Sequence, residues 1–267
     1  MFLKSAKLQE ILKYQKVKIV IIGSGNVAYH LAKALITTEQ NLVQIFGRNQ
    51  KVLKNISEEL NIPFSTKNLA DADLYIISVS DSAVEVVSQQ VFKKNAIVAH
   101  TSGSLPKEIL QGNYQKASFY PLQTFSKIKD LDYSEIPFFI EAETEDVVEK
   151  LKNIAEKISK YVEVADFEKR KYIHLTAVFA CNFVNHLFAR AKEISDSQNI
   201  SFGYFMPLIE ETFDKIKSVE PKAAQTGPAV RNDERILEAH QSLITNPEQL
   251  AIYNCMNASI KEMYKLD

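Results

Sequence analysis

The sequence predicts an α/β fold, in which a doubly wound parallel sheet is followed by a smaller all-helical domain. As far as about residue 164, short apolar runs rich in β-branched residues alternate with amphipathic stretches. Such runs are typical of strands in a parallel sheet, because crossover helices bury both faces of that sheet. Beyond this point only helical periodicity is found. We therefore expect two domains, at residues 1–165 and 166–267.

The elements of the first domain follow from these patterns in order. Parallel strands are expected at residues 17–22, 42–46, 73–79 and 96–99, with helices at 26–36 and 51–60. A third helix is expected to begin near Asp81, whose side chain can cap it. The domain is completed by strands at 117–120, 137–142 and 161–164 and by an amphipathic helix at 144–160.

Two further sets of helices are expected at the ends of the chain. In the second domain, helices are predicted at residues 167–198, 203–217, 233–243 and 247–264. Residues 1–16 are expected to form a short amphipathic helix before the first strand, with a frayed segment or an oligomer contact as alternatives.

Composition excludes several classes of protein. The 267 residues are 46% hydrophobic and 24% charged, as in an ordinary globular protein. A net charge of −1 gives no field that would attract nucleic acid or an anionic membrane. No apolar stretch is long enough to span a bilayer or to act as a signal peptide. The two cysteines lack metal-site spacing and suit a reducing cytoplasm, so we expect a cytoplasmic protein without a metal.

A glycine-rich turn, GSGNVA at residues 23–28, joins the first strand to the first helix. Gly23 is expected to make the tight turn, Gly25 to let a phosphate approach, and Ala28 to pack the helix on the strand. Backbone N–H groups at such a helix start bind pyrophosphate. This setting predicts a Rossmann dinucleotide site, and the alternative is a tight turn without a ligand. The expected cofactor-binding residues of the turn are Gly23, Ser24, Gly25, Asn26 and Val27.

The end of the second strand indicates which dinucleotide is bound. Enzymes that use NAD place an acid there, about twenty residues beyond the turn, to bind the ribose hydroxyls. This chain has no acid at that point and carries Arg48 instead, which suits the 2′-phosphate of NADP. We therefore expect NADP rather than NAD. An S-adenosylmethionine site is disfavoured by the same missing acid, and a solvated surface charge is the alternative for Arg48.

Several strings along the chain resemble one family. In order they are GSGNVA, FGRN, SVSDSA, HTSG at 100–103, YPLQTFS at 120–126, CNFVNH at 181–186 and TGPAVRND at 226–233. Together they resemble NADP oxidoreductases that join a Rossmann-like domain to a helical domain of uncharacterised function. Distant relatives of that family are pyrroline-5-carboxylate reductase, 6-phosphogluconate and 3-hydroxyacid dehydrogenases, and deazaflavin-dependent NADP reductases. The family string commonly reads HPLQTF, so Tyr120 stands here in place of a histidine, and the role of that position is in doubt.

The resemblance implies a fold, a cofactor and an assembly. The second domain is expected to resemble the C-terminal domain of 6-phosphogluconate dehydrogenase-like proteins. A long apolar helix at the start of that domain builds a dimer in such relatives, and a homodimer is therefore expected. No substrate is implied.

Two turns at the carboxyl ends of strands are candidates for contact with the nicotinamide and the substrate. Val79, Ser80 and Ser82 follow one strand, and Thr101 and Gly103 follow the next, so we expect these five residues to form a cofactor wall. In the second turn, His100 and Ser102 are candidate catalytic residues. The alternative is a capped turn that contains a hydrogen-bonded histidine.

The helix AVFACNFVNHLFARA carries polar residues among apolar ones. Asn182 and His186 are four residues apart and share a face, so one hypothesis gives them catalytic roles, with His186 as proton donor. The alternative is a hydrogen-bond network between helices, because buried polar groups need partners. His174 is expected to be structural, and Cys181 to be a small core residue.

Substrate contacts are expected from Tyr120, Gln123 and Arg231. Arg231 could clamp a substrate carboxylate, even across a dimer, or pair with an acid such as Asp233. Asp233 is itself expected to be an N-cap, and His240 to lie at the surface or in an interface.

The function predicted from these residues is hydride transfer between NADP(H) and a small polar carbonyl or imine. The alternative is a non-catalytic NADP-binding sensor or assembly protein, because residues 181–186 lack the lysine that several related dehydrogenases carry.

Overall fold

The computed structural model describes residues 16–266 of the chain. Contacts divide the chain into two compact units, Met1–Cys181 and Asn182–Asp267. The helix expected at the N-terminus falls on residues 1–15, outside the described part. The boundary expected from the sequence, at residue 165, coincides with the end of the last strand, and the division by contacts falls later, inside a long helix. The domain limits 1–165 and 166–267 therefore stay a proposal.

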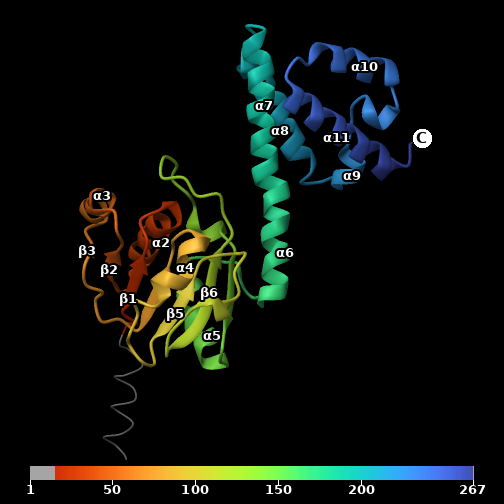
Figure 1. Ribbon diagram of the computed structural model, residues 1–267. Coiled ribbons are helices and arrows are strands. Elements are labelled where there is room, and N and C mark those ends of the chain that lie inside the picture. The colour runs from red at the N-terminus through yellow and green to blue at the C-terminus, as the bar shows by residue number, and fades with distance from the viewer. Residues whose placement is uncertain (1–15, 267) are drawn as a thin grey trace, which may run out of the picture. The chain divides into compact units, whose positions relative to one another are not determined.

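The first unit is built on one sheet of eight described strands, in the order β3-β2-β1-β4-β5-β6-β7-β8 (Figure 1). All neighbouring strands are parallel except β6 and β7, which are antiparallel. The strands are β1 (Ile19–Ile22), β2 (Leu42–Phe46), β3 (Phe64–Ser65), β4 (Leu74–Ile77), β5 (Ile97–His100), β6 (Gln115–Pro121), β7 (Phe138–Ala142) and β8 (Val162–Val164). The predicted doubly wound sheet is confirmed. Strand β3 was not predicted, because two residues carry no periodicity.

Helices cover both faces of this sheet. The helices α2 (Asn26–Thr37), α3 (Gln50–Leu60) and α5 (Glu145–Ala155) pack on one face through a single buried core. Helix α4 (Asp81–Ser88) packs on the other face, where Val84 joins a second core. The expectation that Asp81 caps α4 is wrong: Ser80 is the N-cap, and Asp81 is the first helical residue. Its carboxylate still lies at the positive end of the helix.

The strand order reverses at β1, which has β2 on one side and β4 on the other. In register, Ile22 pairs with Phe46 and with Ile77, and Ile77 pairs with His100. The residues that follow these four strands therefore emerge along one edge of the sheet. A crevice at such a reversal is where open α/β sheets bind their ligands.

From residue 166 onward the described chain is helical, as predicted. The helices are α6 (Phe167–Ala177), α7 (Val184–Ser197), α8 (Met206–Lys215), α9 (Pro221–Ala224), α10 (Glu234–Leu243) and α11 (Pro247–Tyr264). The long helix expected at residues 167–198 runs to Ser197, but a π-helical segment, Val178–Phe183, separates α6 from α7. Asp233 caps α10, since its side chain accepts a hydrogen bond from the Ile236 N–H. None of the helices in residues 16–266 combines the length and apolar character needed to cross a membrane.

Candidate functional site

A cavity of about 1020 Å³ opens at the edge where β1, β2, β4 and β5 end. This volume is at the upper end of the range of about 300–1,000 Å³ found for small-molecule sites. Residues from the turns after all four strands line it, among them Gly23, Ser24, Gly25, Asn26, Val27, Arg48, Val79, Ser80 and Thr101. Nine of the eleven expected cofactor residues therefore share one cavity. The other two, Ser82 and Gly103, are not in its lining.

Gly23 is required by the backbone. Its φ of +145° lies in a region that L side chains rarely adopt. A Cβ atom at this position would also stand 2.1 Å from the carbonyl oxygen of Ser78. The close approach of the turn to the residue after β4 therefore depends on glycine. Ala28 packs on the same spot, with its Cβ 3.4 Å from where a Gly23 Cβ would be, as expected of the third position.

Gly25 and the start of α2 have the properties of a phosphate site. Gly25 is the N-cap of α2, it provides no side-chain cap, and the first turn of the helix contains no acid. A Cβ added at Gly25 would meet no atom within 4 Å. The first N–H groups of a helix have no intrahelical partners and carry partial positive charge. These residues therefore fit the pyrophosphate of a dinucleotide, and Gly25 leaves room for it.

Arg48 lies just beyond β2, on the lining of the same cavity. Its side chain is exposed and forms no hydrogen bond or ion pair within residues 16–266. The neighbouring Asn49 caps α3 by accepting a hydrogen bond from Val52 N–H at 3.1 Å. The guanidinium is therefore free to bind an anion at the edge of the cavity.

The loop after β6 closes another side of the cavity, and sequence reasoning missed most of it. Gln123 and Phe125 line the cavity, and Asn26 Nδ2 donates to the Phe125 carbonyl at 2.9 Å. Lys127 Nζ donates to the Ser24 carbonyl at 3.0 Å, which places a cation beside the phosphate-binding turn. Only the YPLQTFS string pointed to this loop; nothing marked Lys127, which lies one residue beyond it.

His30 on α2 holds this loop in place. Its Nδ1 is 2.9 Å from Tyr133 Oη and its Nε2 is 2.9 Å from the Ser126 carbonyl. Its ring also stacks on Phe125, with centroids 5.3 Å apart. The PLQTFS segment is thus bound to the helix that begins at the glycine turn.

The turn after β5 divides into an exposed and a buried part. Thr101 lines the cavity, whereas the His100 side chain is fully buried. His100 Nδ1 accepts the Ser102 N–H at 3.2 Å, and Nε2 is among the buried atoms with no partner in the described chain. Burial and the nearby charge of Arg170 lower the pKa of His100 to about 4. The imidazole is therefore neutral at physiological pH, and it does not reach the cavity lining.

Ser102 and Gly103 support this turn from within. Ser102 is buried, and its Oγ accepts the Ser104 N–H at 3.0 Å. A Cβ at Gly103 would lie 2.8 Å from Tyr120 Cζ and 2.9 Å from His174 Cβ. Gly103 therefore lets a strand end and a helix approach the turn, rather than contacting the cavity directly.

Tyr120 and His174 meet beside Gly103. Tyr120 Oη is 3.0 Å from His174 Nδ1, and the two rings are in edge contact with centroids 6.0 Å apart. Tyr120 ends β6 and is buried, which raises the pKa of its phenol to about 12. His174 is on α6. Only a structural role was expected for His174, because nothing in the sequence showed that the two residues meet.

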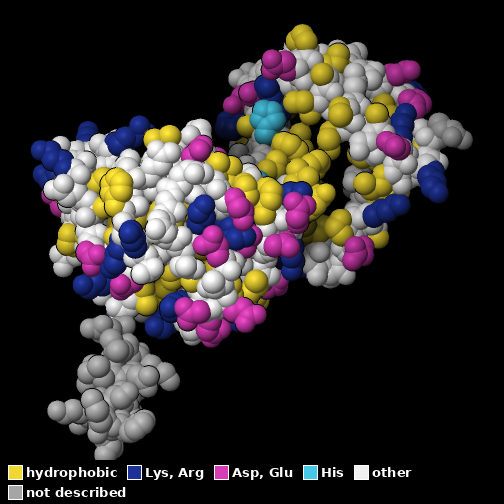
Figure 2. Space-filling model, turned by 60° about the horizontal axis from the view of Figure 1, so that its bottom comes forward, with side chains coloured by type: hydrophobic (Ala, Val, Ile, Leu, Met, Phe, Trp, Pro, Cys, Tyr) yellow, Lys and Arg dark blue, Asp and Glu magenta, His cyan; other side chains and the backbone are white. Residues whose placement is uncertain are grey.

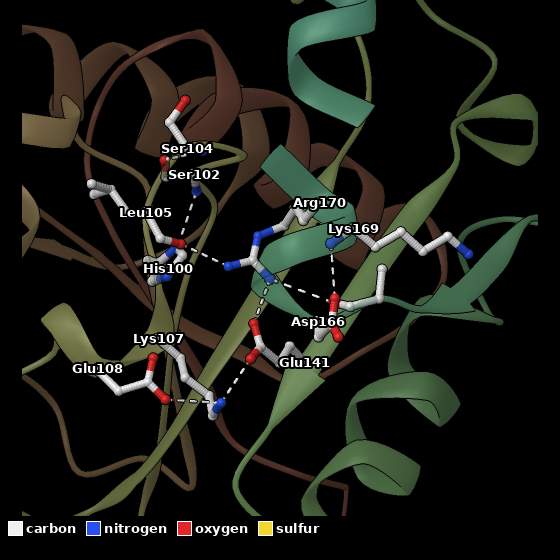
Figure 3. Close-up of polar contacts among 11 residues, drawn as sticks. His100, Ser102, Ser104, Leu105, Lys107, Glu108, Glu141, Asp166, Lys169 and Arg170 are labelled. Atoms are coloured by element: carbon white, nitrogen blue, oxygen red, sulfur yellow. Dashed lines mark hydrogen bonds and ion pairs between the residues drawn. The ribbon is translucent and has the colours of Figure 1, made fainter. Parts of the chain in front are cut away.

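One helical turn before His174, Arg170 fixes α6 to the sheet (Figure 3). Its side chain is fully buried and donates to Glu141 Oε2 at 2.6 Å and to the Leu105 carbonyl at 2.7 Å. Lys107 Nζ pairs with Glu141 Oε1 at 2.7 Å. Burial alone would lower the pKa of Lys107, but its hydrogen bonds to Glu141 and Glu108 outweigh burial and raise that pKa. The carboxylate therefore holds the turn after β5 and α6 together.

Three expected site residues belong to the second unit. Asn182 and His186 are exposed on the long helix, and neither side chain forms a hydrogen bond within the described residues. The network between helices that was the alternative for them is therefore absent from residues 16–266. Arg231 is exposed and has no ion pair with Asp233 in that range. Cys181 is exposed, so the expectation of a core residue is wrong. His240 lies at the surface as expected, and its Nδ1 is 3.0 Å from Tyr253 Oη.

Comparison with known proteins gives two family matches. Residues 18–103 match the family described as NADP oxidoreductase, coenzyme F420-dependent. Residues 136–260 match a domain of unknown function, DUF2520. A search of curated proteins finds no match.

Among solved structures, a protein of Bacteroides fragilis described as a "putative NADP oxidoreductase" is 40% identical to this chain, with a TM-score of 0.88. The alignment covers 92% of this chain and 98% of that one. The chain belongs to this family of NADP oxidoreductases. A Thermotoga maritima protein is 23% identical with a TM-score of 0.69, covering 92% of this oxidoreductase and 98% of its own length.

The fold of this oxidoreductase is shared more widely. A 1-pyrroline-5-carboxylate reductase of Streptococcus pyogenes is 12% identical, with a TM-score of 0.61. The alignment covers 92% of the oxidoreductase and 98% of the reductase. The resemblance expected from the sequence strings is confirmed, and so is the order of a Rossmann-like sheet followed by a helical region.

Proposed function

We propose that this oxidoreductase transfers a hydride between NADP(H) and a small polar carbonyl or imine substrate. The observation that carries the proposal is one cavity lined by both a helix start without a side-chain cap, at Gly25, and the guanidinium of Arg48, which has no partner within residues 16–266. The helix start suits a pyrophosphate, and the guanidinium suits the 2′-phosphate that distinguishes NADP from NAD.

The chain would hold the cofactor with residues of four turns. Gly23–Val27 would take the pyrophosphate, with Lys127 adding charge beside Ser24. Arg48 would take the 2′-phosphate, and the wall formed by Val79, Ser80 and Thr101 would meet the nicotinamide end. Ser82 and Gly103 would support that wall from outside the lining. When bound, the nicotinamide supplies or accepts the hydride.

Substrate contacts are proposed for residues of both units. In the first unit, Gln123 is exposed on the cavity lining, and Tyr120 lies three residues before it. In the second unit, Arg231 forms no ion pair within residues 16–266 and suits a substrate carboxylate. Asn182 and His186 are proposed to contact the substrate, while His100 and Ser102 are assigned to supporting the turn, since both are buried.

The cofactor proposal is tested by titrating the full chain with NADPH and NADH. We expect tighter binding of NADPH, and Arg48→Ala should weaken NADPH binding at least about tenfold while leaving NADH binding nearly unchanged. Lys54→Ala is the matched control, because Lys54 is an exposed cation on α3 outside the cavity lining. Equal or tighter binding of NADH by the wild type would refute the preference for NADP.

The reaction is tested by following NADPH oxidation with a panel of small keto acids, aldehydes and imines. We expect turnover with at least one polar member of the panel. In that assay, His186→Ala should lower turnover strongly and leave NADPH affinity almost unchanged if His186 acts on the substrate. Micromolar NADPH binding without any turnover would favour the non-catalytic sensor instead.

We also propose a homodimer in the cytoplasm. Large apolar side chains of the second unit are exposed, including Leu208 at 64% and Leu243 at 78%, and Figure 2 shows hydrophobic side chains (yellow) at the surface. Where such side chains form a contiguous apolar patch, they mark a surface for association with another protein. The two free cysteines, Cys181 and Cys255, suit a reducing compartment.

A further inference from the structure

The strand order defines where the two ends of a bound dinucleotide would lie. Arg48 follows β2 and the glycine turn follows β1, so a dinucleotide held by both would extend toward β4 and β5. Val79, Ser80 and Thr101 line the cavity at those strand ends. This inference rests on the proposed function, since it takes the reacting end of the cofactor to lie there.

Tyr120 and His174 are outside the cavity lining, but both contact the turn after β5 that contributes Thr101 to it. Gly103, two residues after Thr101, is in contact distance of both rings, and Gln123, three residues after Tyr120, lines the cavity. The pair belongs entirely to the first unit, as does the cavity.

The His174 ring is fixed on one side and open on the other. Nδ1 is held by Tyr120 Oη at 3.0 Å, and this is the only hydrogen bond of the ring within the described residues. Nε2 is not among the buried polar atoms that lack a partner. Four residues earlier, on the same face of α6, Arg170 anchors the helix to Glu141 and to the Leu105 carbonyl. The imidazole is therefore positioned by two separate contacts, with Nε2 available.

We propose that His174 is the catalytic proton donor and acceptor of this oxidoreductase, acting through Nε2, and that Tyr120 and Arg170 are its positioning residues. In the reducing direction, the imidazolium gives its Nε2 proton to the substrate oxygen or nitrogen as the carbon gains the hydride. The ring is left neutral with its proton on Nδ1, where Tyr120 Oη accepts it. In the oxidising direction the same nitrogen takes the proton back. Histidine is the side chain most often used as a general acid or base in enzymes.

The first test locates His174 relative to the nicotinamide without relying on turnover. The full chain is labelled at the ring nitrogens of its five histidines, and His174→Asn identifies the signal of His174. We expect NADP+ to shift that signal and 2′,5′-ADP, which lacks the nicotinamide, to leave it unchanged. His240, exposed on α10, provides the control signal.

Binding is measured separately by calorimetry, so that two failures can be told apart. If NADP+ binds and the His174 signal does not move, the assignment of His174 is overturned while the proposed function stands. If NADP+ does not bind, the proposed function fails, and the assignment fails with it.

The second test uses a substrate found in the panel. His174→Asn should lower kcat by roughly 10²- to 10⁴-fold with the NADPH Kd within about twofold of wild type. Tyr120→Phe should shift the His174 ring signal and lower kcat with little effect on KM. His240→Asn, at an exposed histidine of α10, is the matched control and should leave kcat unchanged. A His174→Asn variant with wild-type kcat, or a His186→Asn variant with the larger loss, would overturn the assignment.

Discussion

At the scale of single residues, Gly23 and Gly25 belong to one turn but meet different requirements. Gly23 has a positive φ and faces the Ser78 backbone, so it is required for folding. Gly25 has an ordinary φ of −77° and faces open space, so folding alone would accept a side chain there. The proposed phosphate of the cofactor would use the space at Gly25, whereas the space at Gly23 is filled by the protein itself.

This difference predicts that alanine at Gly25 mainly weakens NADPH binding, whereas alanine at Gly23 mainly lowers stability. Gly25→Ala should destabilise the fold by only about 1 kcal/mol, as for alanine at an N-cap, and should weaken NADPH binding more than tenfold. Gly23→Ala should lower the melting temperature sharply, because its Cβ would overlap the Ser78 carbonyl. Thermal unfolding and NADPH titration of both variants measure this. An unchanged NADPH affinity in Gly25→Ala would contradict the phosphate site.

His100 predicts how stability depends on pH. Its folded pKa of about 4 lies below the ordinary value of 6.5, so the unfolded chain binds a proton that the folded chain does not. The stability due to neutral His100 is present above pH 6.5 and is lost as pH falls to 4. The loss amounts to roughly 3 kcal/mol. Urea unfolding at several pH values should therefore give a smaller acid loss for His100→Gln than for wild type. His240→Gln is the exposed control, and equal slopes for all three proteins would refute this role.

At the scale of elements, α6 and the turn after β5 are joined by an ion cluster rather than by apolar packing alone. Glu141 accepts from both Arg170 and Lys107, and Arg170 also donates to the Leu105 carbonyl. Arg170 is fully buried, so its charge depends on these partners. The cluster therefore determines how the start of the long helix sits on the sheet.

Removing one charged partner from this cluster should lower the free energy of unfolding by about 3–5 kcal/mol, because the remaining buried charge is uncompensated. Arg170→Met and Glu141→Gln should each lower the free energy of unfolding by that order, and the double variant by less than their sum. Chemical unfolding of the wild type, the two single variants and the double variant gives the coupling energy between Arg170 and Glu141. Lys169→Met is the control, because Lys169 directly precedes Arg170 on α6 but is an exposed cation. This variant should change the free energy of unfolding by less than about 1 kcal/mol. Full additivity would show that the pair is not coupled.

At the scale of the whole molecule, several large apolar side chains of the helical unit are exposed. Phe213 and Ile216 at the end of α8, together with Leu208, are at least 42% exposed. We propose that these side chains of α8 belong to the homodimer interface.

We expect light scattering to give twice the chain mass of 30.3 kDa for the full protein. Leu208→Glu should shift the measured mass toward that of the monomer, because a carboxylate would be buried in the apolar interface. Phe92→Glu, at an exposed apolar residue of the first unit, makes the same change of charge and is the matched control, which should stay dimeric. A wild-type protein that is monomeric at micromolar concentration would contradict the proposal.

The sequence by itself determined the strands of the sheet and most of the turns that line the cavity. The apolar runs gave seven of the eight strands to within a few residues, because burial on both faces produces a local pattern. The turn 23–28 and Arg48 could be predicted for the same reason. Each directly follows a strand, so its place on the cavity lining follows from local sequence and needs no distant partner.

Only the tertiary structure decided which polar residues meet. His174 and Tyr120 are 54 residues apart, and Arg170 and Glu141 are 29 apart, so no periodicity or spacing marks either pair. Burial of His100 and exposure of Asn182 and His186 likewise depend on what packs over them, and reading the helix alone predicted the reverse for the latter two. Local patterns determine the elements and their turns, while the chemistry beside the cavity depends on contacts between elements distant in the chain.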